Sequence, residues 1–292
     1  IHVGKTFLHE VEAMKGVKVT KLPQLAVTGA LFCQKIDPTG NPSIGSGKLD
    51  GDGIPPDFFS DINVRKAFMH AYDGDTFLKE VVNGLGSLPG TPLIKGLAYK
   101  NDVPMYAFDL KKSKEYMKKA WGGQVWKKGF KMIITHNTGR EEREAAALML
   151  KENIESLNPK FRIEVRNVDW KDYMPAIRQF RYPIFIIGWG ADYPDPHNFM
   201  YPYMSSNGTY GKFMGYNNPD VDKLLKAGIE NVEPEKRAAA YDKLQNIWYE
   251  DALGIALFQP LELFDYRDYV KGYNRNPMFS QTVEWFWNIT KE

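Results

Sequence analysis

Apolar residues follow one another without a polar break at residues 184–187. Four consecutive apolar positions, mostly β-branched, favour a strand that is covered on both faces, as in a parallel sheet. The full strand is predicted at residues 182–189, and two further strands are predicted at residues 130–136 and 161–168. Amphipathic helices are predicted between them, at residues 139–157 and 170–180. This alternation with short links predicts an α/β fold built on a βαβαβ unit of parallel strands.

Strands are also predicted outside this unit, at residues 24–33, 255–259 and 263–270. Further helices are predicted at residues 61–72, 75–83, 110–121, 220–229 and 234–252. Residues 37–60 and 86–104 are rich in Gly and Pro, which predicts an irregular connection and a long surface loop. The opening and closing strands flank a self-contained α/β unit. This layout predicts one lobe inserted between two pieces of another, joined by crossing strands.

Composition limits the function classes without choosing one. The 292 residues carry 38 basic and 36 acidic side chains, and this balance does not favour nucleic acid as a partner. No continuous apolar stretch approaches the roughly 20 residues that a membrane helix needs. The chain opens with Ile1 rather than Met and has no signal-peptide pattern, so we expect a processed product or a piece of a longer protein.

The motifs of common enzymes and cofactor sites are missing from the sequence. It has no nucleotide-binding glycine loop and no nucleophile elbow, and its five histidines lack the spacing of metal ligands. Its single cysteine, Cys33, lies in an apolar strand, where a thiol usually behaves as a small hydrophobe. We therefore predict no catalytic residue, no cofactor and no metal.

The segment that follows residue 188 holds the candidate chemistry. Parallel sheets bind ligands where their strands end, and Trp189, Asp192 and Tyr193 emerge at that end. Trp170 directly follows the preceding strand, so we expect both indoles at the same edge of the sheet, although either could be core. Asp195 precedes a proline, which is the ordinary start of a helix. For Asp192, loop capping and ligand binding both remain open.

Several blocks of the sequence match a known family. They read DINVRKAFMHAY from residue 61, YAFD from residue 106, VDW from residue 168, GWGADYPDPHNF from residue 188 and GYNNPDVD from residue 215. With these blocks the sequence, from about Leu22 to its end, resembles the family 5 extracellular solute-binding proteins of ABC importers. That group includes dipeptide- and oligopeptide-binding proteins.

The resemblance implies a periplasmic-binding-protein-like fold of two lobes (type II, cluster C) that close on a ligand. Residues 1–36 and 254–292 would be remnants of the first lobe, and residues 37–253 would form the second, ligand-closing lobe. Asp192 would pair with the α-ammonium group of a peptide, and Trp189 and Trp170 would line side-chain pockets, with Tyr193 beside them.

The resemblance also implies the biological setting. It implies a non-catalytic, monomeric protein that delivers peptides to a membrane permease, either in the periplasm or lipid-anchored outside a Gram-positive cell. Two alternatives remain open from the sequence. One is an oligosaccharide-binding member of the same family, whose tryptophans would stack on sugar rings. The other is a glycosidase-like hydrolase that uses Asp192 with Asp195 or a more distant acid.

Overall fold

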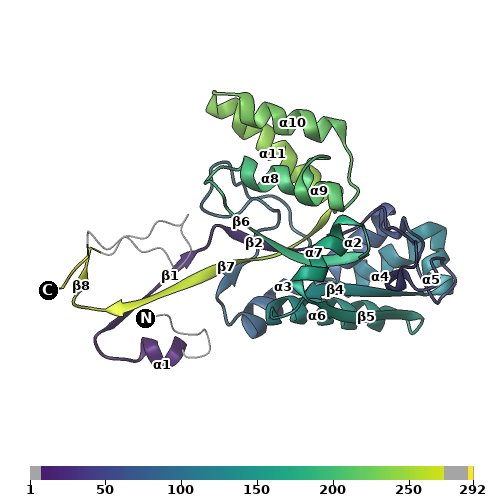
Figure 1. Ribbon diagram of the computed structural model, residues 1–292, viewed down its shortest axis with the longest axis horizontal. Coiled ribbons are helices and arrows are strands. Elements are labelled where there is room, and N and C mark those ends of the chain that lie inside the picture. Colours follow the sequence, from purple (N-terminus) through teal and green to yellow (C-terminus); the bar gives the residue numbers. More distant parts are fainter. Residues whose placement is uncertain (1–7, 273–288, 292) are drawn as a thin grey trace.

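The computed structural model describes residues 8–272 and 289–291, where the chain forms a mixed sheet with helices around it (Figure 1). The strands are β1 (Val17–Pro23), β2 (Ala26–Phe32), β3 (Gly86–Ser87), β4 (Phe130–Asn137), β5 (Phe161–Val168), β6 (Ile184–Gly190), β7 (Gly254–Arg267), β8 (Val270–Lys271) and β9 (Thr290–Lys291). The helices are α1 (Leu8–Glu12), α2 (Ile62–His70), α3 (Gly74–Thr76), α4 (Leu110–Lys119), α5 (Gln124–Lys128), α6 (Glu141–Leu157), α7 (Trp170–Arg178), α8 (His197–Met204), α9 (Thr209–Phe213), α10 (Pro219–Glu230) and α11 (Pro234–Glu250). Single turns of other helix types occur at Pro42–Ile44, Phe58–Ser60, Phe77–Val81 and Ala120–Gly123.

The predicted βαβαβ unit is present. β4 lies between β5 and β6 and is parallel to both, with Phe130 opposite Phe161 and Ile134 opposite Ile184. α6 connects β4 to β5, and α7 connects β5 to β6. In this arrangement the carboxyl ends of all three strands meet at one edge of the sheet.

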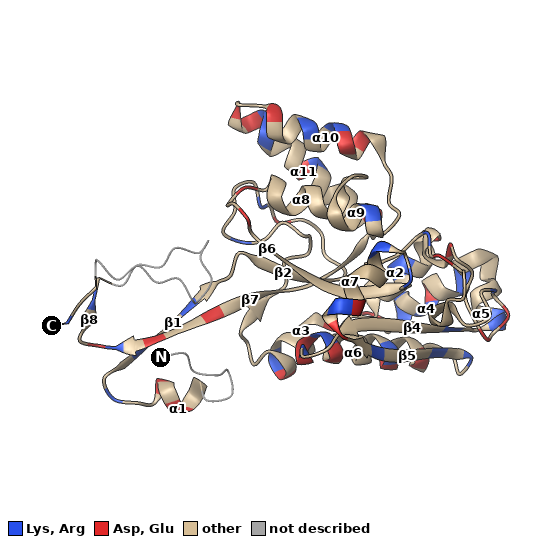
Figure 2. Cartoon of the chain, viewed as in Figure 1, with Lys and Arg blue, Asp and Glu red and all other residues tan. Residues whose placement is uncertain are grey.

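β6 is buried on both faces, as its apolar run predicted. Ile184 and Ile186 belong to the hydrophobic core on one face of the sheet, whereas Phe185 and Ile187 belong to the core on the other. Successive side chains of a strand point to opposite faces, so two cores require an apolar residue at every position. Neither β6 nor its neighbour β2 carries a charged residue, while charges line α4, α6 and α10 (Figure 2).

Strands from the early and late parts of the described chain pair beside this unit. β6 pairs antiparallel with β2, β2 pairs with β7, and β7 pairs with β1. β1 and β7 continue side by side away from the helices (Figure 1). The division into residues 1–36, 37–253 and 254–292 stays a prediction.

The prediction of separate strands at residues 255–259 and 263–270 is wrong, because β7 runs unbroken from Gly254 to Arg267. Pro260 lies at the point where the strand changes partner. β2 pairs with β7 up to Phe258, and β1 pairs with it from Leu261 onward. Pro260 also lies opposite Gly86 of β3, and its carbonyl oxygen accepts from Gln24 N at 2.9 Å, so the strand continues through a residue that has no N–H to donate.

The prediction of a surface loop at residues 86–104 is also wrong for its middle part. Leu93 and Ile94 are fully buried in the same core as Phe185. The buried side chain of Gln259 holds this segment in place: its Oε1 accepts from Lys95 N at 3.0 Å, and its Nε2 donates to Lys95 O at 3.0 Å. A nonlocal contact, invisible in the Gly and Pro pattern, thus decides the path of the loop.

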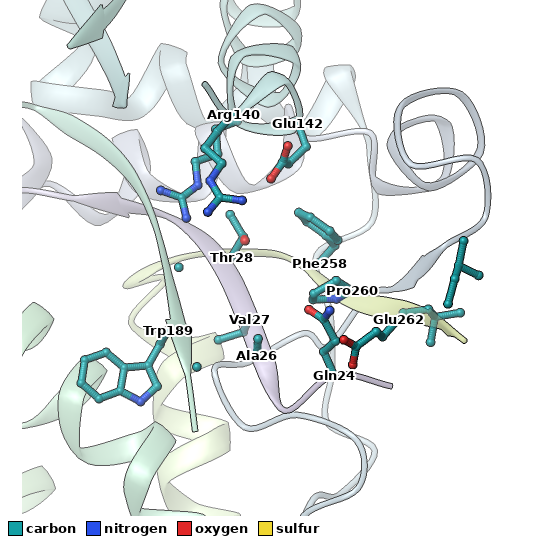
Figure 3. A pocket seen from close by; sticks show the side chains of 15 residues that line it. Gln24, Ala26, Val27, Thr28, Arg140, Glu142, Trp189, Phe258, Pro260 and Glu262 are labelled. Atoms are coloured by element: carbon teal, nitrogen blue, oxygen red, sulfur yellow. The ribbon is translucent and has the colours of Figure 1, made fainter. Parts of the chain in front are cut away.

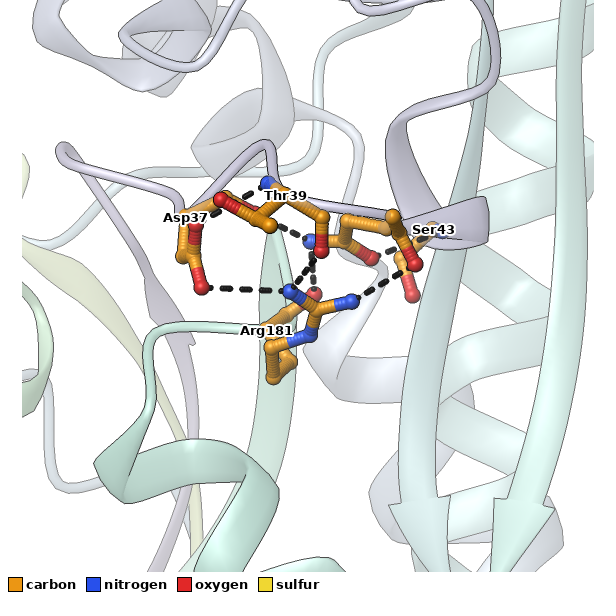
Figure 4. Close-up of polar contacts among 6 residues, drawn as sticks. Asp37, Thr39, Ser43 and Arg181 are labelled. Carbon is orange, nitrogen blue, oxygen red and sulfur yellow. Dashed lines mark hydrogen bonds and ion pairs between the residues drawn. The ribbon is translucent and has the colours of Figure 1, made fainter.

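The irregular connection at residues 37–60 is anchored to the turn before β6 (Figure 4). Arg181 donates to the carboxylate of Asp37 at 3.2 Å and to the carbonyl oxygens of Thr39 and Gly40 at 2.6 and 2.8 Å. Asn41 Nδ2 donates to the carbonyl oxygens of Asp37 and Arg181, each at 2.8 Å. Asp37 lies immediately after the segment that leaves β2, so these bonds fix β2 and β6 relative to each other at that end.

Candidate functional site

The loop between β6 and α8 carries two acids with different environments. Asp195 Oδ1 accepts from His197 N at 2.8 Å, which confirms its role at the start of α8. Its two carboxylate oxygens also accept from Arg237 Nη2, at 2.9 and 2.7 Å. Asp192 is exposed and, among the described residues, forms no ion pair with a cation. The charge of Asp195 is thus neutralised within the fold, while that of Asp192 is available.

Asn198, in the first turn of α8, joins Asp192 to Trp189. Its Oδ1 accepts from Trp189 Nε1 at 3.2 Å and from Asp192 N at 3.0 Å. Its Nδ2 donates to Asp192 Oδ2 at 3.2 Å. Trp189 also makes an edge-to-face contact with Tyr210, with the ring centroids 5.6 Å apart. The acid and the indole are therefore joined by one buried amide.

Trp170 and Tyr193 are exposed and are not part of the hydrogen-bond network around Asn198 among the described residues. Trp170 is 53% exposed at the start of α7, and its ring lies 6.2 Å from that of Tyr173. Tyr193 is 43% exposed. β5, which precedes Trp170, and β6, which carries Trp189, lie on opposite sides of β4. Both indoles lie at the ends of strands at the same edge of the sheet, but β4 lies between those two strands.

A cavity of about 350 Å³ opens where β2, β6 and β7 meet the start of α6 (Figure 3). Trp189 and Gly190 of β6 and Arg140, Glu142 and Arg143 at the start of α6 are among the residues that line it. In Figure 3 the Trp189 indole lies on the other side of β6 from Arg140, Glu142 and Thr28. Asp192 is not among the lining residues but follows Gly190 by two positions. The cavity therefore begins beside the loop that carries the acid.

Arg143 lies against the strands with little room around it. A Cβ on Gly188 would lie 2.9 Å from Arg143 Nη2, so the glycine leaves space for the guanidinium. Arg143 Nη1 donates to Asn137 Oδ1, whereas its buried Nε has no hydrogen-bond partner among residues 8–272 and 289–291. Burial lowers the pKa of Arg143, but a guanidinium stays charged at neutral pH.

The two arginines were not predicted from the sequence, although a signal existed. Arg140 and Arg143 begin the helix that follows β4, and the carboxyl end of β4 lies at the same edge as that of β6. The argument that placed Trp189 and Trp170 at this edge applies equally to them. Neither arginine forms an ion pair with a carboxylate within the part of the chain that the structure describes.

A metal site and a membrane-spanning helix each have clear structural requirements. Within residues 8–272 and 289–291, no three His, Cys, Asp or Glu side chains are grouped closely enough to hold a metal ion. No helix in the same ranges combines the length and apolar character needed to cross a membrane.

Comparison with known proteins identifies the family. The family model described as "Bacterial extracellular solute-binding proteins, family 5 Middle" matches residues 3–211, which is well over half of the chain. The chain belongs to this family. The match includes β4, β5 and β6, the loop with Asp192 and the start of α6, so every site residue described above except Arg237 and Glu262 falls within it.

Three curated relatives illustrate what the chain is similar to. "Probable di/tripeptide-binding protein 5" of Pseudomonas aeruginosa is 25% identical over 232 residues, which cover 78% of this chain and 42% of that protein. The periplasmic oligopeptide-binding protein OppA of Haemophilus influenzae is 28% identical, with 74% and 40% covered. Heme-binding protein A of the same species is 25% identical, with 75% and 40% covered. The chain thus spans about two fifths of the length of these relatives.

Solved structures show the fold of the family. The periplasmic binding protein DppA from Helicobacter pylori, in complex with the peptide STSA, superposes with a TM-score of 0.73 at 22% identity. It covers 98% of this chain, which spans 51% of that protein. HbpA2 from Haemophilus parasuis gives a TM-score of 0.79 at 17% identity, with 99% and 52% covered. The chain has the type II, cluster C fold of solute-binding proteins.

The names of these relatives describe binding proteins: a di/tripeptide-binding protein, a periplasmic oligopeptide-binding protein and a heme-binding protein. The family model is likewise described as one of extracellular solute-binding proteins. The comparisons therefore do not favour the hydrolase alternative.

Proposed function

We propose that this chain forms the ligand-closing lobe of the substrate-binding component of an ABC importer that takes up peptides. Residues 37–253 would form that lobe, and residues 1–36 and 254–292 would belong to the hinge and to the other lobe. The names of the di/tripeptide-binding and oligopeptide-binding relatives support peptides as the ligand class. The observation that carries the proposal is the un-neutralised carboxylate of Asp192 beside Trp189 at the carboxyl edge of the sheet.

Asp192 would anchor the α-ammonium group of the peptide. Asp192 Oδ2 accepts a hydrogen bond from Asn198 Nδ2, and within the described ranges Asp192 Oδ1 has no hydrogen-bond partner. A fixed carboxylate favours a cation more strongly once a closing lobe excludes water. Trp189, and in a larger ligand Trp170 and Tyr193, would supply apolar walls for side chains.

Arg140 and Arg143 would bind the carboxylate group of the peptide. A short peptide with free ends carries one ammonium and one carboxylate. The sheet edge offers Asp192 and, within the described residues, two arginines that form no ion pair, with Glu142 beside them. Arginine binds carboxylates with more than one donor, which suits this role. The match between the two charges of a peptide and the two kinds of charge at this edge supports a peptide over a neutral oligosaccharide.

The hydrolase alternative requires a second acid near Asp192. Asp195 is the nearest one along the chain, but Arg237 and the start of α8 occupy its carboxylate. A carboxylate held by a guanidinium is stabilised in its charged form and does not serve as a general acid. This geometry therefore argues against the hydrolase reading.

Delivery to a permease and location outside the cytoplasmic membrane complete the proposal. The protein would work as a monomer in the periplasm, or as a lipid-anchored protein in a Gram-positive organism, without a cofactor. The permease partner follows from the family, whose members serve importers.

Isothermal titration calorimetry on the full-length protein tests the proposal. The ligands are a tripeptide with free ends, its N-acetylated form, a cello-oligosaccharide and haem. We expect binding of the free tripeptide and a marked loss on acetylation, because acetylation removes the cation that Asp192 would bind. Binding of the oligosaccharide or haem in place of the peptide would overturn the proposal.

The Asp192→Asn variant identifies the anchor in the same assay. We expect it to lose roughly 2–5 kcal/mol of binding free energy for the free tripeptide, the usual loss when one partner of a buried charge pair is removed. Asp220→Asn, which changes an exposed acid on α10, is the matched control. An unchanged preference for the free N-terminus in Asp192→Asn would contradict the anchor role.

A further inference from the structure

We infer that Asn198 is the positioning residue of the site: its side-chain amide fixes the Asp192 carboxylate relative to the Trp189 indole, and this fixed pair reads the N-terminal residue of the ligand. The inference rests on the proposed function, in which Asp192 binds an ammonium group. Asn198, a buried residue of α8, would affect ligand selectivity through its bond to Asp192.

The hydrogen bonds of Asn198 carry the argument. Its Oδ1 accepts two of them, from Trp189 Nε1 at 3.2 Å and from Asp192 N at 3.0 Å. Its Nδ2 donates to Asp192 Oδ2 at 3.2 Å. An amide oxygen has two acceptor positions, so both are in use. One side chain thus fixes the direction of the indole, the backbone of the acid and one oxygen of its carboxylate.

The chemistry of this position is specific to asparagine. An aspartate would accept the two N–H bonds but could not donate to Asp192, and a serine would be too short to reach all three partners. A glutamine is one methylene longer, which does not fit a residue that is only 5% exposed. The combination of two acceptor positions and one donor on a short side chain is what the three bonds require.

Asn198 is itself held firmly. Its backbone N donates to Asp195 O at 3.0 Å, and Asp195 is fixed in turn by the ion pair with Arg237. Asp192, by contrast, is exposed, and a carboxylate with free torsions would sample several directions. The bond from Asn198 removes that freedom before the ligand arrives, which improves binding by pre-organisation.

The same bonds couple two parts of ligand recognition. The indole packs against Tyr210 and is bonded to Asn198, and the carboxylate would meet the ammonium group. A ligand side chain that contacts Trp189 and the N-terminus of the same ligand would then be recognised by one rigid unit. This predicts that Asn198 affects the selectivity for free N-termini more than the affinity for peptides in general.

A double-mutant cycle on the full-length protein tests the inference. Calorimetry is performed on the wild type, Asn198→Ala, Asp192→Asn and the double variant, with a free tripeptide and its N-acetylated form. We expect Asn198→Ala to bind the free tripeptide about tenfold more weakly and the acetylated form within about twofold of wild type, as for the loss of one hydrogen bond to a charged group. In the Asp192→Asn background, Asn198→Ala should have no further effect.

A second readout follows the indole without any ligand. The Trp189 indole N–H resonance, assigned with Trp189→Phe, should shift and exchange faster with solvent in Asn198→Ala than in wild type. Asn246→Ala is the matched control, because Asn246 Nδ2 donates to the carbonyl oxygen of Asp242 within its own helix. The control should change neither the resonance nor the selectivity.

The outcomes separate the inference from the proposed function. Equal losses for both peptides in Asn198→Ala, or a loss that persists in the Asp192→Asn background, would overturn the positioning role and leave the anchor intact. An Asp192→Asn variant that keeps the preference for the free N-terminus would overturn the anchor itself. An unchanged indole resonance in Asn198→Ala would also overturn the positioning role.

Discussion

Replacing Gln259 by leucine should destabilise the protein. The side chain of Gln259 makes three hydrogen bonds, with Lys95 N, Lys95 O and Gln24 O, at 3.0, 3.0 and 2.9 Å. Each contributes about 0.5–1.5 kcal/mol net, so their combined contribution is about 2–4 kcal/mol. Because Lys95 is exposed, water reaches part of the freed backbone, and we expect a loss near the lower end. Leucine has a similar volume, so a cavity adds little.

Urea unfolding followed by circular dichroism measures this loss. Gln124→Leu, at an exposed position on α5, is the control and should change the free energy of unfolding by less than about 0.5 kcal/mol. Gln259→Glu should be worse than Gln259→Leu, because it places a carboxylate against two carbonyl oxygens. If Gln259→Leu unfolds at the same urea concentration as the control, the three bonds do not hold the segment in the core, and the reasoning fails.

Three further predictions address charged groups. Burial lowers the pKa of Lys100 to about 8, below its value in the unfolded chain, so the folded state binds fewer protons between about pH 8 and pH 10. As the pH rises through that window, wild type should gain about 1–3 kcal/mol of stability relative to Lys100→Met. A stability difference in urea unfolding that is the same at pH 8 and pH 10 would contradict this. Asp195→Asn removes the half-buried ion pair with Arg237 and should lose about 1 kcal/mol of stability. The affinity for a tripeptide, measured by calorimetry, should change little. A large loss of affinity with unchanged stability would instead assign Asp195 to ligand binding. Arg143→Leu should weaken binding of a tripeptide with a free carboxylate about tenfold or more but hardly affect its C-terminal amide, and equal weakening of both in calorimetry would exclude Arg143 as the carboxylate partner.

Local patterns predicted most of the fold. The strands and helices between residues 130 and 190 follow from spacing that each segment carries by itself. The helix caps are equally local: Asp61 accepts from Asn63 N at 2.7 Å, and Asp109 accepts from Lys111 N and Lys112 N at 2.9 and 3.0 Å. A side chain that bonds to backbone two or three residues away can be read from the sequence.

The misses share a nonlocal cause. Pro260 interrupts a strand pattern, yet β7 is continuous because different strands pair with it on the two sides of the proline. The burial of Leu93 depends on Gln259, which lies far away along the chain. Arg143 reaches the cavity only because Gly188, on another strand, leaves room for it. Such effects require the fold to be known first.

The candidate site was predicted in composition but not in detail. Trp189 and Asp192 were placed at the end of a buried strand, where the structure has them. Their connection through Asn198 was not foreseen, because the first turn of a helix gives no sign of which way an asparagine side chain points. The ligand-binding roles of Asp192, Trp189, Trp170 and Tyr193 stay predictions.

A crystal structure of the full-length protein with a bound tripeptide tests the central claim most directly. The measured quantity is the distance from the ligand's α-ammonium nitrogen to the carboxylate of Asp192. We predict hydrogen-bond distance, about 2.7–3.2 Å, with Asp192 Oδ2 still bonded to Asn198 and the first side chain of the ligand against Trp189. A peptide bound elsewhere, or one whose ammonium group meets another acid while Asp192 faces solvent, would contradict the account.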